Sequence, residues 1–271
     1  MPSSTGPRIS MDKNEAISKI AQEPEDRLLL SRVWDKYDQC QRRNIPTATS
    51  FLSPRERAMA VALLNTLGVR RGYQADGGYE GAERQILAFL PDWAEDCQDQ
   101  LRFLRAEFPK QEPAPAHRDL LGSLMGLGIT REKLGDILVG DHSADLVVAP
   151  TLADFLLENW ISAGRTHIRV KAIDRWELLV PEEHVEEVRT TVSTLRLDAL
   201  VAAAFPMSRS KAADLIRAGK VSLDHLPSEK PDRLLQEGSL ITARGYGRVQ
   251  LETINGETRK GRLSVVLKKY L

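Results

Sequence analysis

Two helix-breaking residues, Pro206 and Gly219, impose the strongest local constraint on this 271-residue sequence. Proline has no amide hydrogen with which to continue a helix, and glycine readily takes the left-handed conformation that closes one. The pattern therefore predicts one helix over residues 197–205 and a second that begins after Ser208 and ends near Gly219. A strand should follow directly, since "KVSL" is short and rich in apolar residues.

The second of these helices is expected to combine an apolar side with a cationic edge. On an ideal helical wheel its apolar side, which should pack on the first helix, consists of Ala212, Leu215, Ile216 and Gly219. Arg209, Arg217 and Lys220 fall within about 80° of one another beside it. The packing that orders the helix would therefore also hold a row of cations in place.

The first turn of the same helix suits an anion. Ser208 and Ser210, with Arg209 and Lys211, surround a helix N-terminus, where unpaired amides and a partial positive charge favour phosphate. Arginine adds planar, bidentate contacts, and lysine adds a point charge. The alternative interpretation is an ordinary solvated helix surface without a ligand.

A net charge of zero conceals an uneven distribution. Residues 196–271 hold 14 Lys and Arg against 8 Asp and Glu, whereas the other 195 residues hold 24 against 30. A basic C-terminal segment indicates a polyanionic partner. The overall composition, 42% apolar and 28% charged, is that of a folded globular protein.

The sequence gives no sign of a membrane, secreted or metal-binding protein. The longest apolar run, 199–205, is too short to span a bilayer, and the N-terminus lacks a secretory signal. Cys40 and Cys97 show no metal or redox spacing, and the five histidines are scattered. We therefore expect a cytoplasmic protein without a metal or cofactor.

Two short motifs look catalytic but lack the residues that would complete them. "HRD" at residues 117–119 is typical of a kinase catalytic loop, but Leu124 stands where that loop needs a magnesium-binding Asn. "GLGITR" begins like a dinucleotide fingerprint, yet Arg131 replaces the third glycine and a helix rather than a strand precedes it. We expect Asp119 to lie at a helix start, and we expect no enzyme.

The sequence pattern divides the chain into segments with different predicted secondary structure. Residues 1–68 are predicted to be a helical region, with helices at 23–44 and 53–68, the second capped by Ser53 and closed by Gly68. Strands and helices alternate over residues 69–180, which indicates one middle α+β domain. Residues 181–195 are expected to form a polar connector helix, followed by a basic module at 196–271. The fold class is therefore α+β.

The basic module resembles the alpha-L RNA-binding module found in ribosomal small-subunit protein four and in many pseudouridine synthases. "RLD" at 196, "SRSKA" at 208, "LI" at 215, "GKV" at 219, "KP" at 230 and "ITARGYGR" at 241 agree with it in order and spacing. The resemblance implies two or three helices against a small, bent sheet that faces structured RNA. The RNA contacts it implies are Arg196, Ser208, Arg209, Lys211, Arg217, Lys220, Lys230, Arg244 and Arg248.

The module departs from that pattern at one turn. Family members commonly carry Asn-Gly after the first strand, whereas this chain has Asp224 and His225. Because histidine accepts a positive φ less readily than glycine, we expect a wider loop here.

A wider resemblance, over about residues 77–271, is to the YlmH-type RNA-binding proteins of bacteria, some of which are labelled photosystem II "S-four domain" proteins. It rests on "GGYEGAERQI", "HRDLLGSLMGLGITREKLGDILV" and "RGYGRVQLETINGETRKGRLSVVLKKYL". It implies a ferredoxin-like middle domain that also faces RNA. Additional basic residues there and in the tail are weaker candidates: Arg70, Arg71, Arg84, Arg118, Arg131, Arg259, Lys260, Arg262, Lys268 and Lys269.

The resemblance implies a non-enzymatic protein that binds structured RNA, rRNA and possibly tRNA, on the large ribosomal subunit during translation or the rescue of stalled ribosomes. Two alternatives remain open at this point. One is an RNA-modifying enzyme that the module anchors to its substrate. The other is an interaction protein with a role in photosystem assembly.

Overall fold

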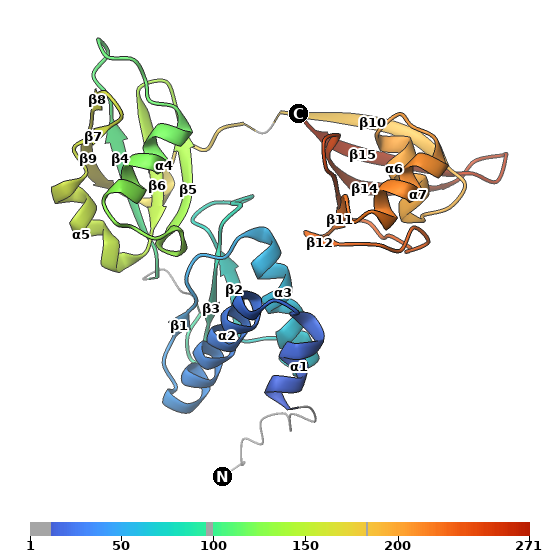
Figure 1. Cartoon of the computed structure of the whole chain (residues 1–271), viewed down its shortest axis with the longest axis horizontal. Coiled ribbons are helices and arrows are strands. Elements are labelled where there is room, and N and C mark those ends of the chain that lie inside the picture. Colours follow the sequence, from blue (N-terminus) through green and yellow to red (C-terminus); the bar gives the residue numbers. More distant parts are fainter. Residues whose placement is uncertain (1–11, 96–99, 183) are drawn as a thin grey trace. The chain divides into compact units, whose positions relative to one another are not determined.

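The chain forms two compact units, one ending at Pro181 and the other spanning Glu182–Leu271 (Figure 1). The computed structural model describes residues 12–95, 100–182 and 184–271, so Cys97 lies outside the described residues. Cys40 is buried with a free thiol. None of the described helices is long and apolar enough to cross a membrane.

Three helices open the first unit: α1 (Lys13–Ile20), α2 (Pro24–Arg43) and α3 (Pro54–Thr66). Both helices predicted in this region are confirmed. Ser53 caps α3 through a capping box, in which its hydroxyl accepts from the Glu56 amide and the Glu56 carboxylate accepts from the Ser53 amide. Gly68 closes the helix in the left-handed conformation, with φ of 79°.

A three-stranded antiparallel sheet packs beside these helices. Its strands are β1 (Thr47–Ala48), β2 (Tyr73–Asp76) and β3 (Ile86–Phe89), in the order β1-β3-β2. β2 and β3 lie on either side of Gly77 and Gly78, within the range where alternating strands and helices were expected. However, they pair with β1 from the predicted helical region, so the boundary expected at residue 68 falls inside this sheet.

The middle of the chain forms a second, four-stranded sheet. Its elements follow one another as β4 (Arg102–Glu107), α4 (His117–Gly126), β5 (Leu134–Val139), β6 (Ser143–Val148), α5 (Pro150–Asn159) and β9 (Arg169–Ile173). Short pieces complete it: η2 (Arg131–Lys133), β7 (Ser162–Ala163), β8 (Thr166–His167) and η3 (Arg175–Glu177). The order β5-β6-β4-β9, with every pair antiparallel, is the ferredoxin-like arrangement that the resemblance implied.

Side chains from outside the sheet pack on both of its faces. Leu120 and Leu124 of α4 and Leu156 of α5 bury one face. On the other, Phe51 from the β1–α3 loop packs with Phe103 and Val147. A Cβ on Gly78 would come within 2.7 Å of the Phe103 ring, so this glycine allows the N-terminal sheet to approach closely. Phe51 therefore covers part of the second face, while Lys171 and Glu107 on the same face stay 51% and 44% exposed.

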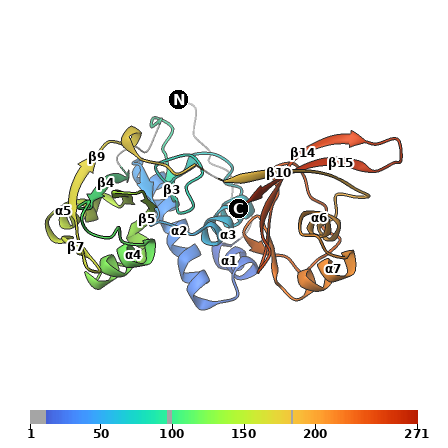
Figure 2. The same ribbon diagram turned by 90° about the horizontal axis from the view of Figure 1, so that it is seen from above.

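The second unit is a six-stranded antiparallel sheet with two helices packed on it (Figures 1 and 2). It comprises β10 (Val185–Val192), α6 (Leu197–Ala204), α7 (Arg209–Arg217), β11 (Val221–Leu223), β12 (Leu226–Pro227), β13 (Leu240–Ala243), β14 (Gly247–Glu257) and β15 (Leu263–Tyr270). The sheet order is β10-β15-β14-β13-β11-β12. Two register shifts in β14 mark irregularities of the kind that bend a strand.

The connector helix expected over residues 181–195 is wrong, because this segment contains the edge strand β10. Val185 to Val192 pair residue by residue with β15, from Tyr270 back to Leu263. The acidic residues suggested a polar helix, but the valines and threonines of "VEEVRTTV" favour a strand. The basic module is therefore larger than expected and begins before Arg196.

The wider loop expected at Asp224 and His225 is also wrong. Both residues take positive φ, 49° and 69°, and form a two-residue hairpin turn in which Leu223 pairs with Leu226. Asp224 is held from outside the turn: its amide donates to the Leu240 carbonyl, and its carboxylate accepts from the Leu240 amide. These two bonds offset the strain of the left-handed conformation.

The predicted helix pair is confirmed. Ala212 and Ile216 of α7 are fully buried against Leu200 and Val201 of α6 and against the sheet. Leu215 is partly buried in the same cluster, and Gly219 closes α7 with φ of 65°. The unit therefore has its own hydrophobic core, which fixes the direction of α7.

Replacing Gly78 by alanine should destabilise the first unit by about 1–3 kcal/mol, because the new Cβ would overlap Phe103 and the residue has φ of 95°. Urea unfolding of the full chain would measure the change. Gly122→Ala is the control, since a Cβ there meets nothing within 4 Å and lies within α4. It should stabilise by about 0.5–1 kcal/mol. Equal effects at both positions would contradict the packing argument.

Candidate nucleic-acid interface

One carboxylate connects the first turns of α6 and α7. Arg196, the N-cap residue of α6, donates from Nε and Nη2 to the two oxygens of Asp198, at 3.2 and 3.1 Å. Arg209, the first residue of α7, donates from Nη2 to Asp198 Oδ1 at 3.1 Å. The Asp198 side chain is only 7% exposed, whereas those of Arg196 and Arg209 are 38% and 47% exposed.

This arrangement favours the ionised carboxylate. Burial alone would raise the pKa of Asp198, but the hydrogen bonds and positive charges of Arg209 and Arg196 together hold it below the usual value. The cluster has one net positive charge, and each guanidinium keeps donors that Asp198 does not use. Asp198 thus neutralises part of the predicted cationic row and also fixes the direction of both arginines.

The N-terminus of α7 lies beside an aromatic turn. Ser208 caps the helix, its hydroxyl oxygen accepting from the Lys211 amide at 3.2 Å. Lys211 Nζ lies 5.5 Å from the centre of the Tyr246 ring, which in turn packs against the buried Phe205. Tyr246 is 40% exposed. A cation beside an exposed ring can serve both a phosphate and an unstacked base.

Lys220 and Arg244 lie next to each other at the other end of α7. The Arg244 amide donates to the Lys220 carbonyl at 2.9 Å, and the adjacent residues Val221 and Ala243 pair between β11 and β13. Within the described residues, neither side chain has a hydrogen-bond or ion-pair partner. The turn that contains Arg244 and Tyr246 therefore runs along α7 and adds cations from the sheet to those of the helix.

Three other predicted contacts have different surroundings. Arg217 pairs with Asp214 one turn earlier on α7, at 3.1 Å, and stays largely exposed. Lys230 belongs to the loop whose Pro231 carbonyl accepts from the Asp198 amide, so it lies near the start of α6. Arg248 stacks over Tyr270 at 5.7 Å and alternates with the buried Val249. It therefore faces away from α6 and α7.

Some of the weaker candidates have structural roles. The Arg84 side chain donates to the carbonyls of Leu134, Phe51 and Arg131. Arg262 donates to the hydroxyl and the carbonyl of Thr191 and so ties β15 to β10. Asp119 accepts from the Ala116 amide at the start of α4, as expected from its position, so the "HRD" motif is part of a helix cap.

Sequence reasoning missed the roles of Asp198 and Tyr246. Asp198 was noted only as part of the "RLD" motif, although its position two residues after an arginine was a usable signal. The position of Tyr246 depends on a turn between two strands that adjoins a helix over 30 residues earlier in sequence. No local pattern encodes that contact.

Asp198→Asn should lower the stability of the second unit by about 1–2 kcal/mol at neutral pH, because two guanidiniums lose their shared anion. A carboxylate with a lowered folded-state pKa stabilises the fold above the unfolded-state pKa, near 4, and this contribution disappears as pH falls through the folded-state pKa. Urea unfolding from pH 7 to pH 3 should therefore show the two proteins converging in acid. The control Asp214→Asn removes an exposed carboxylate and should change stability by less than about 0.5 kcal/mol. A difference that persists unchanged in acid would refute this role.

Comparison with known proteins agrees with both resemblances. Residues 95–177 match the family described as "Putative RNA-binding domain in YlmH", and residues 195–241 match the S4 domain. The first match begins after the β1-β3-β2 sheet and covers the ferredoxin-like region. The second covers α6, α7 and the turn at Asp224.

Two individual proteins are similar to the chain. Ribosome-associated protein quality control protein P2 of Bacillus subtilis (strain 168) is 33% identical over 223 residues, which cover 82% of this chain and 86% of that protein. A solved structure, cell division protein ylmH from Streptococcus pneumoniae, is 17% identical with a TM-score of 0.49, covering 59% of this chain and 98% of that one. On the two domain matches and the Bacillus relative, the chain belongs to the YlmH family.

Proposed function

We propose that this protein binds structured ribosomal RNA through the α7 side of its S4 domain and acts without catalysing a reaction. The observation that carries the proposal is the line of cations along α7. Lys211, Lys220 and Arg244 lie on or beside this helix, and none of them forms an ion pair with a carboxylate within the described residues. Unpaired cations held on a rigid helix and turn are suited to a phosphate backbone.

The geometry favours recognition of shape over recognition of base sequence. Arg196 and Arg209 are oriented by Asp198, so less side-chain freedom is lost when they meet phosphates. Lysine and arginine contacts to phosphate carry no sequence information, and A-form RNA hides its base edges in a narrow major groove. Tyr246 adds one position where an unpaired base could stack.

The name of the Bacillus relative supports a ribosomal setting. We infer that this chain also acts on the ribosome in the cytoplasm, on the large subunit near tRNA, during the rescue of stalled translation. Neither matched family is described by a reaction, which supports a binding protein over an RNA-modifying enzyme.

Lys220→Gln combined with Arg244→Gln should weaken RNA binding about 10- to 100-fold at low salt. Each phosphate contact contributes about −0.9 to the slope of log affinity against log salt. The loss of two contacts should therefore make this negative slope shallower by about 1–2. Filter binding to ribosomal RNA over a salt series would measure both quantities. Arg209 is a poor choice for this test, since replacing it would remove one of the two partners of the nearly buried Asp198.

The matched control is Arg42→Gln combined with Arg43→Gln, which removes two positive charges from the last turn of α2 in the other unit. It should leave the slope unchanged. If both double variants reduce binding equally, net charge and not the α7 surface determines affinity, and the assignment of the interface fails.

The ribosomal part of the proposal predicts co-sedimentation with large subunits and not with small subunits in a sucrose gradient at low salt. Raising the salt concentration severalfold should release the protein, because the binding is mainly electrostatic. A protein that stays in the light fractions, or that follows the small subunit, would contradict the large-subunit assignment.

A further inference from the structure

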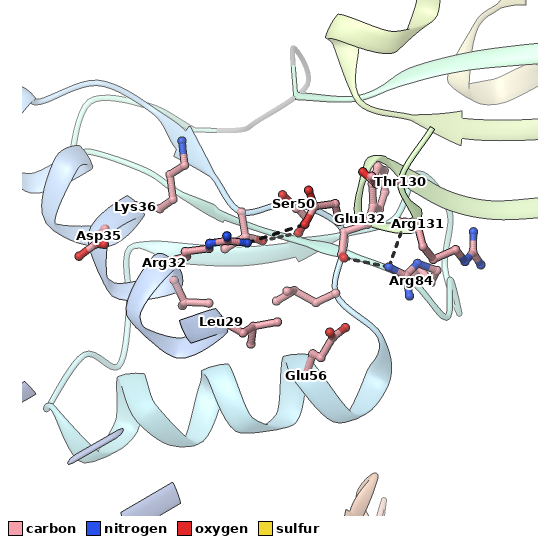
Figure 3. A pocket seen from close by; sticks show the side chains of 14 residues that line it. Leu29, Arg32, Asp35, Lys36, Ser50, Glu56, Arg84, Thr130, Arg131 and Glu132 are labelled. Atoms are coloured by element: carbon pink, nitrogen blue, oxygen red, sulfur yellow. Dashed lines mark hydrogen bonds and ion pairs between the residues drawn. The ribbon is translucent and has the colours of Figure 1, made fainter. Parts of the chain in front are cut away.

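A cleft of about 710 Å³ lies within the first unit, between α2 and the ferredoxin-like region (Figure 3). One wall is a single side of α2, formed by Leu29, Arg32, Val33 and Lys36, whose spacing places them along one stripe. The opposite wall is the segment Thr130–Glu132 with Arg84, and the β1–α3 loop contributes Ser50 and Phe51. The cleft is distant in sequence from the S4 domain.

The floor of the cleft is apolar and its rim is polar. Val33, Phe51 and Leu52 are buried, and Leu29 is half-buried above them. Ser50 and Thr130 bring exposed hydroxyls to the rim. A ligand that fits here has an apolar part to cover the floor and a polar part that reaches the rim.

Positive charge dominates the rim. In Figure 3, Arg32 extends from α2 across the cleft toward Glu132. The Lys36 side chain has no hydrogen-bond or ion-pair partner within the described residues. Arg84 and Arg131 donate to backbone carbonyls and form no salt bridge in the described chain, so their charges stay uncompensated by direct contact. Burial and the charge of Arg84 lower the pKa of Arg131, although Asp136 and Glu83 nearby oppose this effect.

The carboxylates of the cleft are mostly engaged elsewhere. Asp35 pairs with Lys13 at 2.7 Å and so is directed toward α1. Glu56 accepts from the Ser53 amide and caps α3. Of the carboxylates that line the cleft, Glu132 is the one that pairs with a cleft cation, at 3.9 Å from Arg32, with both side chains more than half exposed. An exposed pair at that distance is weak, so an incoming anion can displace it.

We propose that this cleft is a second binding site of the protein and that it takes a single nucleotide, with the phosphate on Arg32 and Lys36 and the base on the apolar floor. The volume suits a ligand of this size, and a phosphate is the anion that an arginine and a lysine one turn apart can hold together. The nucleotide can come from solution or from an unpaired position in RNA. This site goes beyond the proposed function, because it uses a different unit of the chain.

The test is isothermal titration calorimetry of the full-length chain with adenosine 5′-monophosphate, and with adenosine to isolate the phosphate. Arg32→Gln combined with Lys36→Gln should weaken binding of the monophosphate at least tenfold, and adenosine should bind at least tenfold more weakly than the monophosphate. Arg42→Gln with Arg43→Gln is the control, since these residues lie on the same helix outside the cleft. Its binding should match that of the wild type.

A second arm separates the two sources of the nucleotide. Fluorescence anisotropy with a short single-stranded oligonucleotide is measured in the Lys220→Gln, Arg244→Gln background, which removes two proposed RNA contacts of the S4 domain and leaves the cleft unchanged. If only the oligonucleotide binds and the cleft variant weakens it tenfold, RNA supplies the nucleotide. If the cleft substitutions Arg32→Gln and Lys36→Gln weaken binding of the monophosphate but not of the oligonucleotide, the ligand is a free nucleotide from solution. The proposal is overturned if Arg32→Gln with Lys36→Gln changes the affinity neither for the monophosphate nor for the oligonucleotide. It is also overturned if adenosine binds as tightly as its monophosphate. These outcomes are independent of whether the S4 domain binds ribosomal RNA.

Discussion

The shared contact of Arg196 and Arg209 with Asp198 is the interaction on which the account of this protein depends. It joins the first turns of α6 and α7 through one nearly buried carboxylate. Without it, two arginines would lie close together and repel each other. With it, they form a compact group with one net positive charge and with donors that Asp198 does not use. The hydrophobic core between α6 and α7 holds the two helix backbones in place. The contacts with Asp198 then orient the side chains of Arg196 and Arg209.

The first unit shows how side chains can pack on both faces of a ferredoxin-like sheet. Small residues make this possible, because Gly78 and Gly135 leave room for Phe103 and Phe51 at distances that a Cβ would not permit. The sheet face is therefore used for internal packing. The proposed nucleotide site of this unit is the cleft between α2 and residues 130–132, which Phe51 also lines.

Local sequence signals predicted much of the fold. Helix caps such as Ser53 and closing glycines such as Gly68 and Gly219 act within a few residues, so their effect is visible in the sequence. The failures involve partners distant in sequence. β10 is a strand because β15 pairs with it, and Asp224 accepts a positive φ because Leu240 holds it. Likewise, the sequence named Lys211, Lys220 and Arg244 as candidate RNA contacts, but it did not show that Arg248 lies on the opposite face of the sheet or that Tyr246 lies beside α7.

Ultraviolet crosslinking of the intact protein to ribosomal RNA, followed by mass spectrometry of the peptides that carry nucleotides, tests the central claim most directly. The account predicts that nucleotides are attached to peptides from residues 208–220 and 244–248, which contain α7 and the adjoining turn. Crosslinks that are absent from both peptides while other parts of the S4 domain are labelled would show that the oriented cations along α7 do not contact RNA.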